Sequence, residues 1–405
     1  MQQFVRYEGE NEKMNFEFSE KSNSIEGGIF NILNDKKKDL LNRGMKVFNF
    51  SIGTPDFQPA PHIMEAMQEA CKDPQNYKYA IDDKPELVQA MIDYYKNRFG
   101  VALEENEIMT VYGSQEGMAH FGWAICNPGD VVLVPNPGYP IFSIGPMFCD
   151  AKIVEYPIYP EDNYMLKFEN IPEDVARKAK LIVVSYPLNP VCAVADDKFY
   201  EELIAFAKKY NIIVLHDNAY ADIVYGGREG KSFLEYEGAK DVGVEFYSLS
   251  KTYNMTGMRI SFTVGNADII AQFKKVRSQV DYGIFPAIQL AAVAALTGPQ
   301  DMVKDQCAEY ERRNKALCGG LRDIGWNVPN SQGSMFVWAN IPEGFESSEK
   351  FVLELMEKSG VIVVPGTAFG SLGEGYVRFA LVYPVEVIEE AVKAIADSGI
   401  LKSKI

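Results

Sequence analysis

The chain has 405 residues and a formal net charge of −16, which comes from 56 acidic and 40 basic side chains. This length exceeds what one hydrophobic core usually holds, so we expect one large domain and a smaller one. Nucleic acid and anionic membranes repel a chain this acidic, and we expect neither as a partner.

The cysteines and the N-terminal sequence indicate the cellular compartment. The six cysteines include no Cys-x-x-Cys pair and the chain holds only three histidines, so we expect free thiols and no metal site. Residues 1–31 contain no apolar core of signal-peptide length, and no later run reaches the roughly 18 apolar residues of a membrane span. We therefore expect a cytoplasmic protein.

The N-terminal quarter predicts an arm, helices and a short turn. Residues 1–24, rich in Glu, Asn and Lys, indicate an arm that is mobile or embraces a partner. Apolar spacing predicts a helix over 29–43, and a strand over 47–53 leads into Gly53-Thr54-Pro55-Asp56, where the glycine lets a ligand approach the backbone. Two further amphipathic helices are expected at 63–71 and 86–99.

From residue 107 onward, short apolar runs alternate with helices. Such runs are what a parallel sheet covered on both faces requires, so we predict an α/β fold with a doubly wound, mostly parallel sheet. The expected strands are 108–112, 131–134, 153–154, 181–185, 212–215, 242–247 and 260–265. The expected helices are 118–126, 198–210 and a long helical region from 267 past 315.

The last hundred residues change character. Strands expected at 335–338, 361–364 and 376–380 alternate with helices at 349–358 and 385–396. We interpret this part as a smaller α+β domain. The predicted division is an arm over 1–24, a small domain made of 25–50 with 290–405, and a large domain over 51–289.

Polar side chains follow four of the expected strands. In chain order they are Gly113-Ser114-Gln115, Asn189, Asp217 with Tyr220, and Lys251. Because the carboxyl ends of parallel strands line one crevice, we expect these side chains to converge. Burial near a strand end lowers the pKa of a lysine, which leaves free amine to attack a carbonyl carbon and form a Schiff base.

Together these groups meet the requirements of one cofactor. Ser248, Ser250 and Arg259 surround Lys251 with phosphate donors, and a helix N-terminus after Gly113 can hold an anion. A lysine can react with an aldehyde, a carboxylate can pair with a pyridinium nitrogen, and a phenol and an amide can hydrogen-bond a ring hydroxyl. Pyridoxal 5′-phosphate needs all of these groups. Taken singly, such residues are commonly solvated charges, helix caps or turn residues.

The sequence resembles the class I/II aminotransferases, the fold-type-I pyridoxal phosphate enzymes, over roughly residues 25–395. Within this family, His216–Asp222 and Asp281-Tyr282-Gly283 are most similar to the branch of alanine, LL-diaminopimelate and aspartate aminotransferases. The motifs that carry the resemblance occur in the family's order: Gly53–Phe57, Gly113–Gly117, Tyr186–Pro190, His216–Asp222 and Ser248–Arg259.

The resemblance implies a role for each residue. Lys251 would be the Schiff-base lysine and would move the proton between the amino acid's Cα and the cofactor, while Asp217 would keep the pyridine nitrogen protonated. Arg378 would clamp the substrate α-carboxylate, with Gly53 and Asn189 assisting. The other implied cofactor contacts are Tyr220 and Asn189 at the ring oxygen, Tyr139 stacked on the ring, and Ser114, Gln115, Ser248, Ser250 and Arg259 at the phosphate.

A homodimer with shared active sites is also implied, because Tyr79 resembles the tyrosine that reaches the neighbouring subunit's phosphate. The family normally carries a glycine and about one more residue where this chain has Asp82–Glu86, so Tyr77 remains the alternative. Leu188, Val191 and Met258 also depart from the family pattern, but none of them removes a cofactor contact.

The reaction implied is transamination, in which an amino group moves from an L-amino acid to a 2-oxo acid through a Lys251 aldimine. A carbon–sulfur β-lyase or a cyclopropane-forming synthase stays open as the alternative, because the outcome depends on which Cα bond stands perpendicular to the ring. A ligand-sensing regulator would need a basic DNA-binding module before the aminotransferase-like part. Because only acidic-leaning residues precede the family match, we do not expect a regulator.

Overall fold

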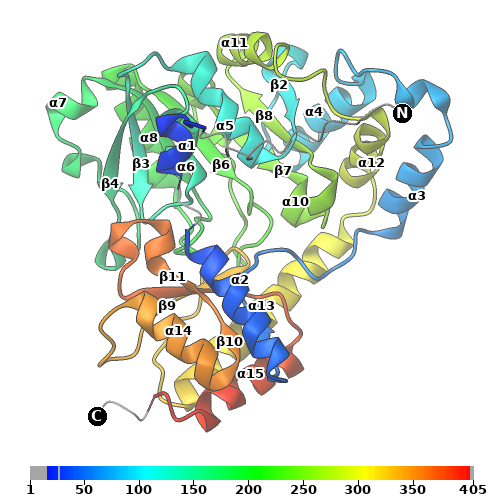
Figure 1. The fold of residues 1–405 in the computed structure, drawn as a ribbon. Helices are drawn as coiled ribbons and strands as arrows, with labels where there is room; N and C mark the ends of the chain where they lie inside the picture. Colours follow the sequence, from blue (N-terminus) through cyan, green and yellow to red (C-terminus); the bar gives the residue numbers. More distant parts are fainter. Residues whose placement is uncertain (1–15, 26–27, 402–405) are drawn as a thin grey trace, which may run out of the picture.

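The computed structural model describes residues 16–25 and 28–401. Within them lie a seven-stranded, a three-stranded and a two-stranded sheet. Figure 1 shows the seven-stranded sheet with its helices in the upper part and the C-terminal strands with α2 (Gly28–Asn42), α14 (Ser348–Ser359) and α15 (Val385–Asp397) below. The helix α13 (Asp301–Asp323) runs between these two parts.

The large sheet confirms the predicted mostly parallel α/β fold. Its order is β2-β8-β7-β6-β5-β3-β4, and only β8 runs antiparallel to its neighbours, β2 and β7. β2 therefore points the same way as β7, and both strands end at one edge. The strands are β2 (Ile108–Val111), β3 (Val131–Asn136), β4 (Lys152–Pro157), β5 (Ala179–Ser185), β6 (Ile213–Asn218), β7 (Gly243–Ser248) and β8 (Ser261–Gly265).

The longer helices around this sheet follow the predicted pattern apart from one break and one earlier start, and four short helices, at 141–147, 173–176, 239–242 and 249–252, were not predicted. The region expected to be helical from 267 past 315 is broken into three helices, and Pro286 begins the second of them at a position that needs no backbone N–H donor. The helix expected from 118 already begins at Ser114. The helices are α3 (Pro61–Ala70), α4 (Pro85–Phe99), α5 (Ser114–Ile125), α6 (Ile141–Met147), α7 (Glu173–Ala176), α8 (Asp197–Tyr210), α9 (Ala239–Val242), α10 (Leu249–Thr252), α11 (Ala267–Arg277), α12 (Pro286–Thr297) and α13.

The two smaller sheets join the N-terminal segment to the C-terminal part. In the three-stranded sheet, β12 (Tyr376–Ala380) lies between β11 (Val364–Pro365) and β9 (Phe336–Asn340), antiparallel to both. The strand expected over 47–53 is shorter: β1 (Phe48–Asn49) pairs in parallel with β10 (Val361–Ile362). After β1, the backbone N–H of Ser51 donates to the side chain of Asn49, and the chain turns away from the sheet.

The predicted arm lies partly outside the described residues. Its described end forms the short helix α1 (Glu20–Ser24), where Lys21 pairs with Asp150 at 2.8 Å and donates to the carbonyl of Phe148 at 3.0 Å. This end of the chain therefore rests beside the C-terminus of α6. No helix in the described ranges combines the length and the apolar character needed to cross a bilayer.

Candidate active site

A cavity of about 1160 Å³ opens at the carboxyl edge of the large sheet. Its walls come from this edge, from the segment after β1 and from the three-stranded sheet. Twelve of the thirteen predicted site residues line it: Gly53, Ser114, Gln115, Tyr139, Asn189, Asp217, Tyr220, Ser248, Ser250, Lys251, Arg259 and Arg378. The fold thus brings together side chains that are far apart in the sequence.

Lys251 lies in the four-residue helix α10 instead of the predicted turn. The hydroxyl of Ser248, at the end of β7, caps this helix by accepting from the backbone N–H of Ser250 at 3.1 Å. The Lys251 amine donates to the carbonyl oxygen of Gly53 at 2.6 Å. Burial, together with the positive charges of Arg378 and Arg259, lowers the pKa of Lys251 to about 8. A substantial fraction of this amine is therefore uncharged near neutral pH.

Asp217 is a buried carboxylate near the end of β6. Its Oδ1 atom has no hydrogen-bond partner among the described residues. Burial raises the pKa of Asp217 to about 7, although the charge of His216 opposes the shift. A buried, unpaired carboxylate oxygen facing a cavity is costly unless a ligand donates to it. The N–H of a pyridinium ring fits this acceptor.

A cup for an anion lies at the start of α5. Gly113 adopts φ of +85°, and a Cβ atom at this position would overlap the guanidinium of Arg259. The arginine therefore packs across the turn that begins the helix. The buried hydroxyl of Ser114 has no partner among the described residues. A helix N-terminus, a free hydroxyl and a guanidinium are donors that a phosphate requires.

Arg378 enters the cavity from the central strand of the three-stranded sheet, β12, and is buried rather than a surface charge. It donates to Asn189 Oδ1 at 2.9 Å and to the carbonyl of Ser51 at 3.1 Å. The rings of Phe336 and Phe369 flank it, with centroids 4.2 and 4.6 Å from the guanidinium carbon. Burial lowers the pKa of Arg378 to about 10, which leaves it charged near neutral pH.

Two tyrosines close the cavity from the side of the large sheet. Tyr139 donates to Gln115 Oε1 at 2.8 Å. Tyr220 is buried and packs edge-on against Phe336, with ring centroids 5.8 Å apart. Burial raises the pKa of both phenols, so both carry their protons near neutral pH and can donate hydrogen bonds.

Tyr79 is the predicted site residue that this single chain does not bring into the cavity. Tyr79 is 79% exposed, and its ring packs against that of Tyr282, with the ring centroids 5.0 Å apart. The alternative, Tyr77, also lies outside, with its hydroxyl donating to the carbonyl of Cys71 and its ring packed against Phe285. A role for either tyrosine in another subunit's site stays a prediction.

Sequence reasoning identified Asn189 beside Arg378 but not the other residues that hold the arginine. Phe336 and Phe369 have the apolar character of ordinary core residues, and Ser51 acts through its backbone carbonyl, so no motif marks any of them. The register of β12 against β9, which pairs Arg378 with Trp338, brings the arginine close to Phe336, and Phe369 comes from the short helical turn Gly366–Phe369.

Comparison with known proteins identifies the family. The family model described as aminotransferase class I and II matches residues 45–395. The chain belongs to the class I and II aminotransferases. Two similar relatives of this aminotransferase are LL-diaminopimelate aminotransferases. The one from Halothermothrix orenii is 43% identical, covering 88% of this chain and 92% of the relative, and the one from Aquifex aeolicus is 41% identical, covering 94% and 99%.

Solved structures agree with this assignment. Substrate-bound BacF from Bacillus subtilis matches the aminotransferase with a TM-score of 0.91 and 36% identity, covering 95% of this chain and 98% of BacF. A probable N-succinyldiaminopimelate aminotransferase from Thermus thermophilus matches with a TM-score of 0.87 and 32% identity, covering 92% and 100%. The predicted fold-type-I architecture and the predicted transaminase activity are both confirmed, and the chain is a transaminase that moves amino groups between amino acids and 2-oxo acids.

Proposed function

We propose that this aminotransferase binds pyridoxal 5′-phosphate in the cavity and that Lys251 attaches it. The observation that carries the proposal is that a depressed-pKa amine, an unpaired buried carboxylate oxygen and an unpaired buried hydroxyl line one cavity. When bound, the cofactor supplies an electron sink for the charge left at the amino acid's Cα. Lys251 would hold its aldehyde carbon, Asp217 its ring nitrogen, and Ser114 with Arg259 its phosphate.

The remaining predicted contacts complete the proposed cradle. Tyr220 and Asn189 would donate to the ring oxygen, and Tyr139 would stack on the ring face. The N-terminus of α5 would add backbone donors at the phosphate. The side chains that would join Ser114 and Arg259 there are Gln115, Ser248 and Ser250.

Lys251 would also move the proton of the reaction. With a pKa near 8, its amine could accept a proton from the amino acid's Cα and deliver it to the cofactor's aldehyde carbon. Arg378 would hold the substrate α-carboxylate by exchanging its present acceptor, the side chain of Asn189, for two carboxylate oxygens. The carbonyl of Gly53, which now accepts from Lys251, would line the substrate side.

The side chains of the cavity wall bear on which amino acid the enzyme uses. LL-diaminopimelate, the substrate in the names of the similar relatives, is the first donor to assay. Among the described residues that line the cavity, the cations are Lys251, Arg259 and Arg378, and each already has a proposed role. The wall also includes apolar side chains, so amino acids with neutral, apolar side chains are the second class to compare. These wall residues are Ile25, Phe30, Ile52, Ile144 and Phe148.

We further propose a cytoplasmic homodimer. Large apolar side chains are exposed on two segments that meet through the contact between Tyr79 and Tyr282, and a second copy of the chain would cover them. In such a dimer Tyr79, or Tyr77, would reach the partner's phosphate. The exposed residues are Tyr77, Tyr79, Ile81, Val280 and Tyr282.

We also propose residues 51–289 as the large domain and 25–50 with 290–405 as the small one, so that the cavity lies between them.

The test is a half-reaction with one amino acid at a time. The protein loaded with pyridoxal phosphate should lose its visible band with a true donor and release one equivalent of the matching 2-oxo acid. Pyruvate and ammonia without that loss would instead support the carbon–sulfur lyase. Protein that takes up no cofactor would refute the proposal.

A further inference from the structure

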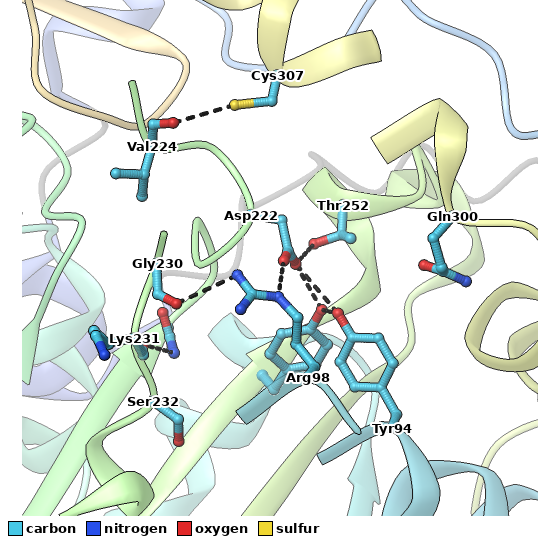
Figure 2. A network of polar contacts seen from close by, with 12 residues as sticks. Tyr94, Arg98, Asp222, Val224, Gly230, Lys231, Ser232, Thr252, Gln300 and Cys307 are labelled. Carbon is cyan, nitrogen blue, oxygen red and sulfur yellow. Dashed lines mark hydrogen bonds and ion pairs between the residues drawn. The ribbon is translucent and has the colours of Figure 1, made fainter. Parts of the chain in front are cut away.

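A buried carboxylate, Asp222, joins the chain segment that follows Asp217 to the segment of Lys251. Figure 2 shows Asp222 at the centre of a polar network, with Arg98, Tyr94 and Thr252 directed toward it. Its Oδ2 atom accepts from Thr252 Oγ1 at 2.9 Å and from the hydroxyl of Tyr247 at 2.8 Å. Its Oδ1 atom accepts from Arg98 Nε at 3.1 Å.

The position of this network in the chain connects it to the proposed reaction. Thr252 directly follows Lys251 in α10, and Asp222 lies five residues after Asp217 on the loop that leaves β6. The hydrogen bond from Thr252 to Asp222 therefore fixes the lysine-bearing helix against the loop that bears Tyr220 and follows the strand of Asp217. Nothing else in the proposed reaction requires Asp222 or Thr252.

The charge of Asp222 is balanced within the network. The side chain of Asp222 is 5% exposed and that of Arg98 is 26% exposed, so the pair is largely shielded from water. Arg98 also donates to the carbonyl of Gly230 at 3.3 Å, which holds the guanidinium in place. A shielded carboxylate with several donors has a fixed position, and its acceptor geometry is therefore well suited to hold a partner hydroxyl.

A second contact secures α10 from another direction. The side chain of Gln306, on α13, donates to the backbone carbonyl of Lys251 at 2.7 Å and accepts from Asn254 at 2.6 Å. A four-residue helix cannot hold its own orientation, because it contains too few internal hydrogen bonds. The orientation of Lys251 thus depends on contacts from outside the helix, of which the bond between Thr252 and Asp222 is one.

We propose that Asp222 and Thr252 are positioning residues that aim the Lys251 amine into the cavity. The proposal rests on the function proposed above. A proton-transferring amine must lie within hydrogen-bond reach of two carbon positions in turn, and a displacement of about 1 Å can reduce the rate about 100-fold. Loss of the Thr252 hydroxyl would free α10 to rotate and would let the amine move toward solvent.

The test compares Thr252→Val, which keeps the shape and removes the hydroxyl, with Thr252→Ser, which keeps the hydroxyl. Tyr94→Phe is the matched control. Its hydroxyl lies 3.5 Å from Asp222 Oδ2 and belongs to the same network, but Tyr94 is on α4 and not on α10. A general loss of network stability would affect Thr252→Val and Tyr94→Phe alike, whereas a loss of positioning would affect only the first.

The first readout needs no cofactor. The rate at which acetic anhydride labels Lys251 in the ligand-free protein, followed by peptide mass spectrometry against pH, gives the pKa of its amine. The charges that act on this amine are those of Arg378 and Arg259, and the other titratable groups of the cavity include Asp217, Tyr139 and Tyr220. All of them are unchanged in the three variants. We expect the pKa of Lys251 to rise in Thr252→Val toward the ordinary lysine value and to stay at the wild-type value in Thr252→Ser and Tyr94→Phe.

The second readout is steady-state kinetics. Thr252→Val should lower kcat about tenfold or more while KM changes less than about twofold, and Thr252→Ser should restore kcat. A wild-type pKa and kcat in Thr252→Val, or equal losses in Tyr94→Phe, would overturn the proposal. If Thr252→Val does not fold, Asp222→Asn answers the same question through the same pKa measurement. Failure of the wild-type protein to bind cofactor would refute the proposed function but would leave the labelling result interpretable.

Discussion

The amine of Lys251 lies 2.6 Å from the carbonyl oxygen of Gly53, a residue 198 positions away in the chain. The contact joins the carboxyl edge of the large sheet to the segment that follows β1. A carbonyl is a neutral acceptor and contributes no negative charge, so it does not reverse the effect of burial and of Arg378 on the lysine. The pKa of Lys251 therefore stays low.

Cofactor loading should follow the ionisation of Lys251. With a pKa of about 8, the free-amine fraction rises about tenfold for each pH step below that value and levels off above it. The loading rate of the ligand-free protein, followed by absorbance, should show the same dependence once the titration of the cofactor itself is subtracted. A rate that rises steeply up to about pH 10 would show an ordinary lysine.

The glycine at the start of α5 offers a test of the phosphate cup. Gly113→Ala should weaken cofactor binding, because a Cβ atom would displace the guanidinium of Arg259. Gly129→Ala is the matched control, since Gly129 has nearly the same φ, +86° against +85°, but open space around it. Both variants should lose stability, on the order of 1–3 kcal/mol, because each places a side chain at a positive φ. Titration with pyridoxal phosphate should show a raised Kd only in Gly113→Ala.

Removal of the Arg378 guanidinium should affect substrate binding and leave the cofactor in place. Arg378→Ala should raise KM for every amino acid and lower kcat/KM about 100-fold or more, as expected when one partner of a buried charge pair is lost. The visible spectrum of the loaded protein should not change. Arg312→Ala, which removes a surface arginine paired with Glu309, serves as the control. Unchanged KM values in Arg378→Ala would refute the carboxylate role.

Asp217 should destabilise the ligand-free protein above neutral pH. Its pKa is raised from 3.8 to about 7 in the folded chain, so the folded state keeps a proton that the unfolded state releases between these values. Stability is therefore lost as pH rises through this window, by up to about 4 kcal/mol. Asp217→Asn should raise the thermal midpoint of the ligand-free protein at about pH 8, and this gain should shrink toward pH 4. An equal change at both pH values would contradict the assignment.

The same substitution should have the opposite effect in the presence of cofactor. An asparagine can accept a hydrogen bond but carries no charge to pair with a pyridinium ring. Asp217→Asn should therefore bind pyridoxal phosphate more weakly, and titration of the visible band gives the change in Kd. Unchanged affinity would show that the ring nitrogen lies elsewhere.

Much of the large sheet could be predicted from sequence because its strands are buried on both faces. β3 and β7 are buried at every position, and such burial favours apolar residues, as in Val131–Val134 of β3. Parallel topology then placed Asn189, Asp217 and Lys251 at one edge. The short helix α10 was missed because four residues are too few for a helical period to be visible.

Contacts between separate parts of the chain could not be predicted in this way. Arg378 comes from another sheet, and only the family resemblance suggested its role; nothing in the residues around it indicates that Phe336 and Phe369 enclose it. The bond between Thr252 and Asp222 joins two segments whose local patterns are unrelated. The role proposed for Tyr79 or Tyr77 would require a second subunit.

The most direct test of the account is to identify the residue that carries the cofactor. Protein loaded with pyridoxal phosphate is reduced with borohydride, which makes the link between cofactor and amine permanent, and is then digested for peptide mass spectrometry. We expect one pyridoxyl phosphate group per chain, on Lys251, and none in Lys251→Ala. A label on another lysine, or no label in the wild-type protein, would contradict it.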